Sequence, residues 1–241
     1  MRDGLQKVTV VSEAALVLVC KRPAWGIGKQ RLAASLGPEV AARVAEALLA
    51  CALEDASGWD GPVVIAPAHH SDHAWAEALL PRLQPKVRIQ PQAAGNLGQR
   101  LNILDRQLRD GGLRQLVYIG SDAPLLAGTD YAAVKDALDS HDVVLKPAAD
   151  GGVVLMASCR LWPPLSRLPW STDCLGAALT DCCRAAGQTV ATLTDSFDVD
   201  EQDDFMRLTV GLGTDKRPAR RALHALACDI AQLTEAGHVQ I

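Results

Sequence analysis

The sequence predicts an α/β protein built on a mostly parallel, mixed sheet with helices on both faces. The first observation is the Val- and Leu-rich run AALVLVC at 14–20, which is typical of a strand buried on both faces. The second is the alternation of such runs with helical segments, as in βαβ units. The third is the stretch DVVLKPAADGGVVLM at 142–156, whose two apolar runs are too close together for a helical crossover and so predict an antiparallel pair.

The remaining elements follow in order along the chain. Further strands are expected at 62–67, 86–90, 115–120 and 189–193. Helices are expected at 38–56, 73–80, 97–109, from about 129, at 174–186 and from 201. We expect a single α/β domain over 1–210 followed by a helical appendage over 211–241.

Composition and charge favour a globular protein with a small-molecule ligand. The chain has 241 residues, of which 49% are hydrophobic, enough for a substantial core. Its net charge is −4 and its longest basic stretch is KRPARR at 216–221, so a nucleic-acid partner has little electrostatic support. The seven cysteines lack a CxxC pair and are interpreted as reduced thiols. Because the run at 14–20 is shorter than the roughly 20 residues that span a bilayer, we expect a cytoplasmic protein without a membrane span.

A basic, glycine-containing loop, KRPAWGIGKQRL, comes directly after the first strand. Ligands of open α/β sheets bind beyond the carboxyl ends of the strands. Gly26 and Gly28 would let the backbone approach a ligand, and the nearby cations suit phosphate oxygens. These cations are Lys21, Arg22, Lys29 and Arg31. The alternative is a basic surface loop with glycines at its turns.

Asp122 stands in GSDAPLL, immediately after the apolar run QLVYI. A carboxylate at the end of a buried strand can hold a hard divalent cation and leave other positions to water and diphosphate oxygens. The alternative is a capping or Asx-turn residue before the helix near Thr129.

Two further acidic motifs are candidates. Asp198 and Asp200 are two residues apart in an extended segment, so both can face one ion or one substrate hydroxyl, although Asp200 can also cap the following helix. Asp150 precedes two glycines, which predicts a tight turn or a carboxylate over an acceptor. Trp170 is interpreted as a core residue or a sugar-stacking one. The histidines near His73 are interpreted as a solvated helix start.

Six motifs in this order carry a resemblance to a known family. They are KRPAWGIGKQRLAASLG, QAAGNLGQRL, GSDAPLL, PAADGGVVL, PWSTD and DVDEQDDF. Together they resemble a bacterial GT-A-like glycosyltransferase family of uncharacterised proteins in the nucleotide-diphospho-sugar transferase superfamily. That family is distantly similar to the molybdenum-cofactor guanylyltransferases and 2-phospholactate guanylyltransferases. The resemblance implies a GT-A fold, a Rossmann-like three-layer sandwich that binds a nucleotide diphosphate through a divalent metal.

The resemblance also implies roles for individual residues. Lys21, Lys29 and Arg31, with Gly26 and Gly28, would face phosphates. Gly98 and Arg100 would lie on the nucleotide side. Asp122 and Asp200 would contact the metal, and Asp150 and Asp198 would face the acceptor as candidate catalytic carboxylates. The sequence departs from the family pattern at Gln30, in place of Thr, and at Val153, in place of Tyr.

Three functions remain open at this point. The first is glycosyl transfer from a nucleotide-diphospho-sugar to an unknown acceptor, with Mg²⁺ or Mn²⁺ on Asp122 stabilising the departing diphosphate. The second is nucleotidyl transfer from an NTP to a phosphorylated acceptor with release of pyrophosphate. The third is a nucleotide-binding module that has lost catalysis, suggested by Gln30 and Val153.

Overall fold

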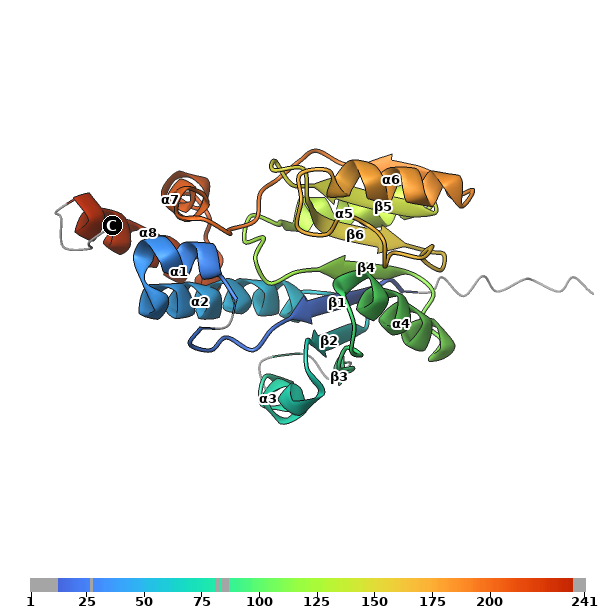
Figure 1. Cartoon of the computed structure of the whole chain (residues 1–241), viewed down its shortest axis with the longest axis horizontal. Coiled ribbons are helices and arrows are strands. Elements are labelled where there is room, and N and C mark those ends of the chain that lie inside the picture. Colours follow the sequence, from blue (N-terminus) through green and yellow to red (C-terminus); the bar gives the residue numbers. More distant parts are fainter. Residues whose placement is uncertain (1–12, 27, 81–82, 84–86, 236–241) are drawn as a thin grey trace, which may run out of the picture.

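The protein is described by a computed structural model over residues 13–26, 28–80, 83 and 87–235. Seven strands form one sheet in the order β3-β2-β1-β4-β6-β5-β7 (Figure 1). They are β1 (Ala15–Cys20), β2 (Val63–Pro67), β3 (Val87–Ile89), β4 (Leu116–Ile119), β5 (Val143–Pro147), β6 (Val153–Ser158) and β7 (Val190–Thr192). Among these strands β6 alone is antiparallel to its neighbours. The predicted mixed, mostly parallel sheet is therefore confirmed.

The helices are α1 (Gln30–Leu36), α2 (Pro38–Ser57), α3 (His73–Glu77), α4 (Leu97–Asp110), α5 (Gly128–Leu138), α6 (Leu175–Ala185), α7 (Gln202–Gly211) and α8 (Pro218–Glu235), with a 3₁₀ turn, η1 (His70–Asp72). The sequence did not predict α1, and α3 ends three residues before the expected helix end. The predicted strand at 86–90 corresponds to β3, but Lys86 lies outside the described residues.

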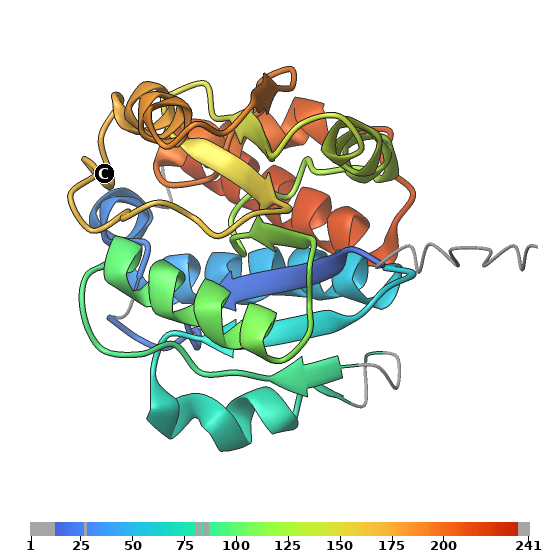
Figure 2. The same cartoon turned by 90° about the vertical axis from the view of Figure 1, so that its right-hand side faces the viewer.

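Alternation along β1 explains the three layers. Leu16 and Leu18 face a core shared with α2, α3 and α5, whereas Ala15 and Val17 face a second core with α4 and α6. Helices accordingly lie on both faces of the sheet (Figure 2). All four side chains are fully buried. Because burying one large aliphatic side chain is worth about 1.5–3 kcal/mol, both faces of the sheet must be covered. The predicted GT-A type of three-layer sandwich is confirmed.

The β5–β6 pair is the predicted antiparallel neighbour pair, and its turn depends on glycine. Gly151 has φ 88°, and a Cβ there would lie 1.9 Å from the carbonyl oxygen of Asp173. Only glycine tolerates both conditions. Asp150 Oδ1 accepts a hydrogen bond from the Gly152 amide at 2.9 Å. The turn therefore fixes the orientation of the Asp150 carboxylate.

The helix α8 shares a third core with α1, α2 and α7. From α8, Leu223, Ala227 and Ile230 contribute apolar side chains, while Arg220 is 0% exposed. Within the expected 211–241 appendage, Pro218–Glu235 form α8, which packs on α2 and α7. In the described part of the chain, no helix combines the length and apolar character needed to cross a membrane. All seven cysteines are free.

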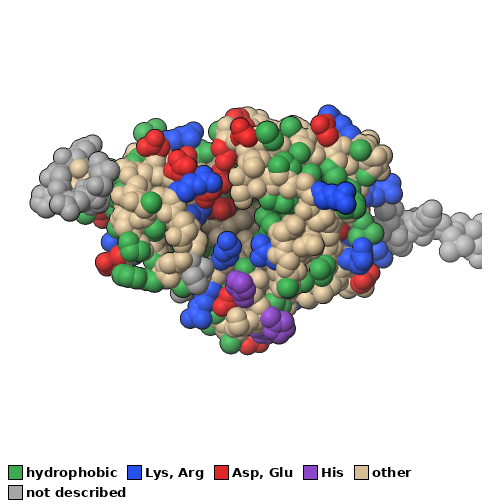
Figure 3. Space-filling view, viewed as in Figure 1, with side chains coloured by type: hydrophobic (Ala, Val, Ile, Leu, Met, Phe, Trp, Pro, Cys, Tyr) green, Lys and Arg blue, Asp and Glu red, His purple; other side chains and the backbone are tan. Residues whose placement is uncertain are grey.

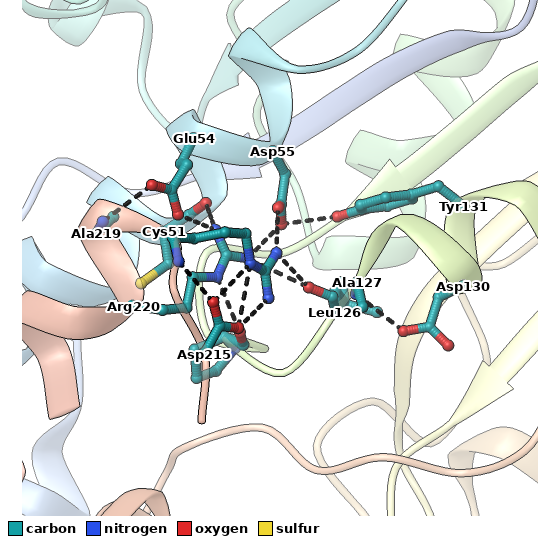
Figure 4. Close-up of polar contacts among 12 residues, drawn as sticks. Cys51, Glu54, Asp55, Leu126, Ala127, Asp130, Tyr131, Asp215, Ala219 and Arg220 are labelled. Carbon is teal, nitrogen blue, oxygen red and sulfur yellow. Dashed lines mark hydrogen bonds and ion pairs between the residues drawn. The ribbon is translucent and has the colours of Figure 1, made fainter. Parts of the chain in front are cut away.

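Arg220 lies at the centre of a polar network between α2, α5 and α8 (Figure 4). Its guanidinium pairs with Asp55 at 2.6 Å and Glu54 at 3.0 Å, and donates to the Cys51 carbonyl. Its Nε donates to the Pro124 carbonyl at 3.1 Å. Arg217 also reaches this region, because its Nη1 donates to the Leu126 carbonyl at 2.9 Å and to Asp55 at 3.0 Å. The C-terminal helix therefore holds the coil that follows Asp122.

Candidate active site

A cavity of about 660 Å³ opens beyond the carboxyl ends of β1 and β4. The chain passes from β1 to β2 and β3 on one side and then returns to β4 on the other, so this is the topological switch point where open α/β sheets bind ligands. Figure 3 shows a hollow in the middle of this face, with acidic and basic side chains both gathered around it. The volume is typical of a pocket for a nucleotide-sized ligand.

Most of the sequence-predicted site residues line this one cavity. Those that do are Lys21, Arg22, Gly28, Lys29, Arg31, Arg100, Asp122, Asp150, Asp198 and Asp200. Gly26 and Gly98 are not among its lining residues. The Gly26 carbonyl accepts a hydrogen bond from Gln30 at 2.7 Å, and a Cβ on Gly98 would lie 2.1 Å from the Leu165 carbonyl oxygen. Gly98 thus lets the loop before α6 pack on α4.

Three carboxylates meet at one end of the cavity. Asp122, Asp198 and Asp200 each offer an oxygen, and these atoms lie within 4.8 Å of one another. The Val199 amide donates to the Asp122 carbonyl oxygen at 2.9 Å, which ties the two acidic segments together. A Cβ on Gly120 would lie 2.4 Å from Asp122 Oδ1, so a glycine there leaves room for the carboxylate.

The capping alternatives for two of these residues are wrong. The residue before α5 is Ala127, and its amide donates to the side chain of Asp130 rather than to that of Asp122. The helix α7 is preceded by Glu201, which forms a capping box with Asp204. Neither Asp122 nor Asp200 therefore caps a helix with its side chain, and both residues line the cavity.

Lys29 is the cation closest to this acidic cluster. Its backbone is left-handed, with φ 47°, at the junction of the basic loop and α1. Its Nζ lies 2.7 Å from Asp200 Oδ1 and 3.4 Å from Asp122 Oδ2. Burial acts to raise the pKa of Asp200, but the charge and hydrogen bond of Lys29 outweigh it and hold that pKa below its ordinary value. Two of the three carboxylates are therefore charge-compensated.

Asp198 is the carboxylate without such a partner. It forms no ion pair with any described residue. Burial, and then the negative charges of Asp122, Asp200 and Asp150, raise the pKa of Asp198 to about 7. Holding this group ionised costs free energy that a bound cation would recover.

This raised pKa predicts a pH-dependent stability difference for Asp198→Asn. Between the ordinary pKa of an aspartate, 3.8, and about 7, the unfolded chain releases a proton that the folded chain keeps, so the free energy of unfolding of the wild type falls as pH rises. Asparagine removes this loss. We expect the variant to gain roughly 2 kcal/mol over the wild type between about pH 4 and about pH 8, after allowance for partial exposure.

The measurement is urea unfolding of both proteins in EDTA across this pH range. The exposed Asp203 on α7 supplies the matched control Asp203→Asn, which should show no such trend. A stability difference between the wild type and Asp198→Asn that stays constant with pH would contradict the raised pKa.

The acidic cluster fits a hard divalent cation. Carboxylate oxygens are the ligands that Mg²⁺ and Mn²⁺ prefer, and an octahedral ion with oxygens at roughly 2.0–2.1 Å needs them no farther apart than about 4 Å. The separations here, within 4.8 Å, require only small side-chain movements.

Trp170, the histidines near His73, and Val153 are the remaining residues that the sequence analysis singled out. Trp170 is half-buried, donates to the Leu165 carbonyl at 2.9 Å, and both packs on the core and lines the cavity. His70 is exposed and His73 half-buried, and His73 lies 3.7 Å from Glu77, as expected for a solvated helix start. Val153 lines the cavity.

Sequence reasoning did not single out Gln92 or Arg220. Gln92 stands inside the motif QAAGNLGQRL, but its burial comes from neighbouring strands. The burial of Arg220 could have been predicted, because Arg220 falls on the same helical stripe as the apolar residues Leu223, Ala227 and Ile230. A charged residue on a buried stripe predicts a buried ion pair.

The fold resembles those of solved structures whose names describe nucleotide-using transferases. A crystal structure from Desulfovibrio desulfuricans, provisionally named a nucleotide-diphospho-sugar transferase, superposes with a TM-score of 0.80 at 23% identity, covering 93% of this chain and 98% of that one. A cytidylyltransferase from Leptospira borgpetersenii has a TM-score of 0.53 at 12% identity, covering 94% and 96%. A 4-diphosphocytidyl-2C-methyl-D-erythritol synthase from Anaerococcus prevotii has 0.53 at 10%, covering 80% and 94%. At these identities the likeness is one of fold.

The family is shown by sequence. Residues 49–172, more than half of the chain, match the bacterial family described as "Uncharacterized protein conserved in bacteria (DUF2064)", and the chain belongs to that family. Comparison with curated proteins gives no match.

Proposed function

We propose that this protein is a metal-dependent glycosyltransferase that takes its donor from a nucleotide-diphospho-sugar. The observation that carries the proposal is the meeting of Asp122, Asp198 and Asp200 at one end of a cavity that five cations also line. The cations are Lys21, Arg22, Lys29, Arg31 and Arg100. Only a ligand that brings both a divalent cation and several anionic oxygens satisfies both groups, and a metal-bound diphosphate does so.

The acidic and the basic residues of the cavity would bind different parts of the donor. Asp122, Asp198 and Asp200 would hold the cation, which supplies Lewis-acid stabilisation of the departing diphosphate when bound. Lys21 and Arg31 would bind the remaining phosphate oxygens. Lys29, already hydrogen-bonded to Asp200, would keep the negative charge of the cluster in balance before the ligand arrives.

Asp150 is our candidate for the acceptor base. It lines the cavity from the β5–β6 turn, outside the group of three carboxylates that can share one ion. Its Oδ1 is engaged by the Gly152 amide, which fixes the carboxylate and leaves Oδ2 for an acceptor hydroxyl. Asp198, the other candidate, lies within the metal group and is assigned there.

Nucleotidyl transfer is the second candidate. Two features favour it: the fold is shared with cytidylyltransferases, and Lys29 lies where a third phosphate could be neutralised. In this reaction a phosphate oxygen of the acceptor would attack the α-phosphorus of an NTP, so that the nucleoside monophosphate is transferred to the acceptor and pyrophosphate is released.

Product analysis separates the two reactions. The protein is incubated with Mn²⁺ and either UDP- and GDP-sugars or the four NTPs, and released NDP and pyrophosphate are quantified. We expect slow transfer of sugar to water, with NDP as the product, and no pyrophosphate. Pyrophosphate from an NTP with no turnover of any NDP-sugar would overturn glycosyl transfer in favour of nucleotidyl transfer.

A further inference from the structure

Gln92 lies where β3 and β2 end, on the side of the cavity away from the acidic cluster. Its amide donates to the Pro67 carbonyl at 2.9 Å, and its side-chain Nε2 donates to the Ala66 carbonyl at 2.7 Å. The residue is 5% exposed and lines the cavity. Because Nε2 must face the Ala66 carbonyl, the identity of the opposite atom as the oxygen Oε1 is fixed.

Oε1 of Gln92 has no hydrogen-bond partner among the described residues. A buried carbonyl oxygen left in this state is costly, and such groups usually meet a ligand or a water. An amide oxygen accepts hydrogen bonds and donates none. Phosphate groups at neutral pH are acceptors as well, so Oε1 cannot serve the diphosphate.

The wall around Gln92 suits a flat, mostly apolar ligand. Val19, Cys20, Ala68 and Leu97 line the same cavity, and the Ala68 amide is already used by the Cys20 carbonyl at 2.8 Å. Among the described residues, Arg100 also lines the cavity and has a buried polar atom without a hydrogen-bond partner, the donor Nε. A nucleobase is flat, and its pairing edge presents N–H donors that a free acceptor such as Oε1 of Gln92 can bind.

The distance along the sheet agrees with this placement. Gln92 hydrogen-bonds to the end of β2, while Asp122 follows β4, and β1 lies between these two strands. Two strand spacings amount to roughly 10 Å. A ribose would bridge this gap if the diphosphate lies at Asp122 and the base at Gln92.

We propose that Gln92 is a base-recognition residue, whose Oε1 accepts a hydrogen bond from an N–H of the nucleobase of the bound nucleotide. The proposal rests on the proposed function, because it requires a nucleotide in this cavity. It assigns the β2 side of the cavity to the base and the β4 side to the phosphates.

Calorimetry with UDP, GDP, CDP, ADP and inorganic pyrophosphate, each with Mn²⁺, tests the assignment in the full chain. Gln92→Leu removes the acceptor at similar size, and Gln92→Met repeats the test with a more adaptable side chain. The matched control is Gln90→Leu, on the same segment but not a cavity-lining residue. We expect Gln92→Leu to weaken the preferred NDP about tenfold and to flatten the ranking among bases. Pyrophosphate affinity should stay unchanged.

The outcomes separate the two proposals. If the wild type binds none of the four NDPs, the proposed function fails. If the wild type binds an NDP, and the folded Gln92 variants bind it as tightly with the same ranking, the proposed function stands and the role of Gln92 is overturned. Equal loss of NDP and pyrophosphate affinity would also overturn it, because base recognition leaves pyrophosphate binding intact.

Discussion

Asp122→Asn is expected to lower turnover of the preferred nucleotide-diphospho-sugar by about 10²- to 10³-fold while leaving the protein folded. The physical reason is that Asp122 offers one of the three oxygens that can hold a cation against the departing diphosphate. Replacing it with a neutral amide removes charge where negative charge must be neutralised. Stability should be little affected, because Lys29 keeps its stronger bond to Asp200 at 2.7 Å. Steady-state kinetics at several Mn²⁺ concentrations provide the measurement.

Asp203→Asn serves as the control, since it makes the same chemical change three residues from Asp200 on the exposed side of α7. It should retain full turnover. If Asp122→Asn and Asp203→Asn were equally active at limiting Mn²⁺, Asp122 would have no part in holding the metal.

Arg220→Ala is expected to destabilise the fold by about 3–5 kcal/mol, a large share of the roughly 5–15 kcal/mol that stabilises a typical domain. The guanidinium is fully buried and compensates Asp55, which is itself buried. Burial raises the pKa of Asp55 even though Arg220 and Arg217 act against it, so removing one arginine leaves a poorly compensated buried carboxylate. Urea unfolding near neutral pH measures the loss.

The neighbouring residue offers the control. Arg221 is exposed on the same helix, and Arg221→Ala should change the free energy of unfolding by less than about 0.5 kcal/mol. The double variant Arg220→Met with Asp55→Asn should recover part of the loss, because it removes both charges. Equal effects of Arg220→Ala and Arg221→Ala would show that the network adds nothing to stability.

The sequence was most informative about the sheet. The run at 14–20 contains β1, with both faces buried, and the close spacing of two apolar runs around Gly151 predicted the antiparallel β5–β6 pair correctly. Both patterns are local, since they depend on side-chain alternation and loop length. The helix α1 was not predicted from the sequence, because it has only seven residues and no side-chain cap.

The site was predictable as far as strand ends are predictable. Asp122 comes shortly after β4, and Lys29 lies in the loop that follows β1. Because β1 and β4 are neighbours in the sheet, the two side chains meet. Gln92 and Arg220 could not be placed in the same way. The free oxygen of Gln92 depends on Nε2 being held by Ala66 in a neighbouring strand, and the burial of Arg220 depends on α8 returning to α2. Both contacts are long-range and arise only once the chain has folded.

Binding of a metal and a nucleotide at one site is tested by titrating Mn²⁺ into the wild type and Asp198→Asn, each with and without UDP or GDP, and following the binding by calorimetry. We expect the wild type to bind one Mn²⁺ together with one nucleoside diphosphate, each strengthening the binding of the other. In Asp198→Asn this mutual strengthening should be lost. Nucleotide binding by the wild type that is indifferent to Mn²⁺, or Mn²⁺ binding that survives unchanged in Asp198→Asn, would contradict a metal-nucleotide site at Asp122, Asp198 and Asp200.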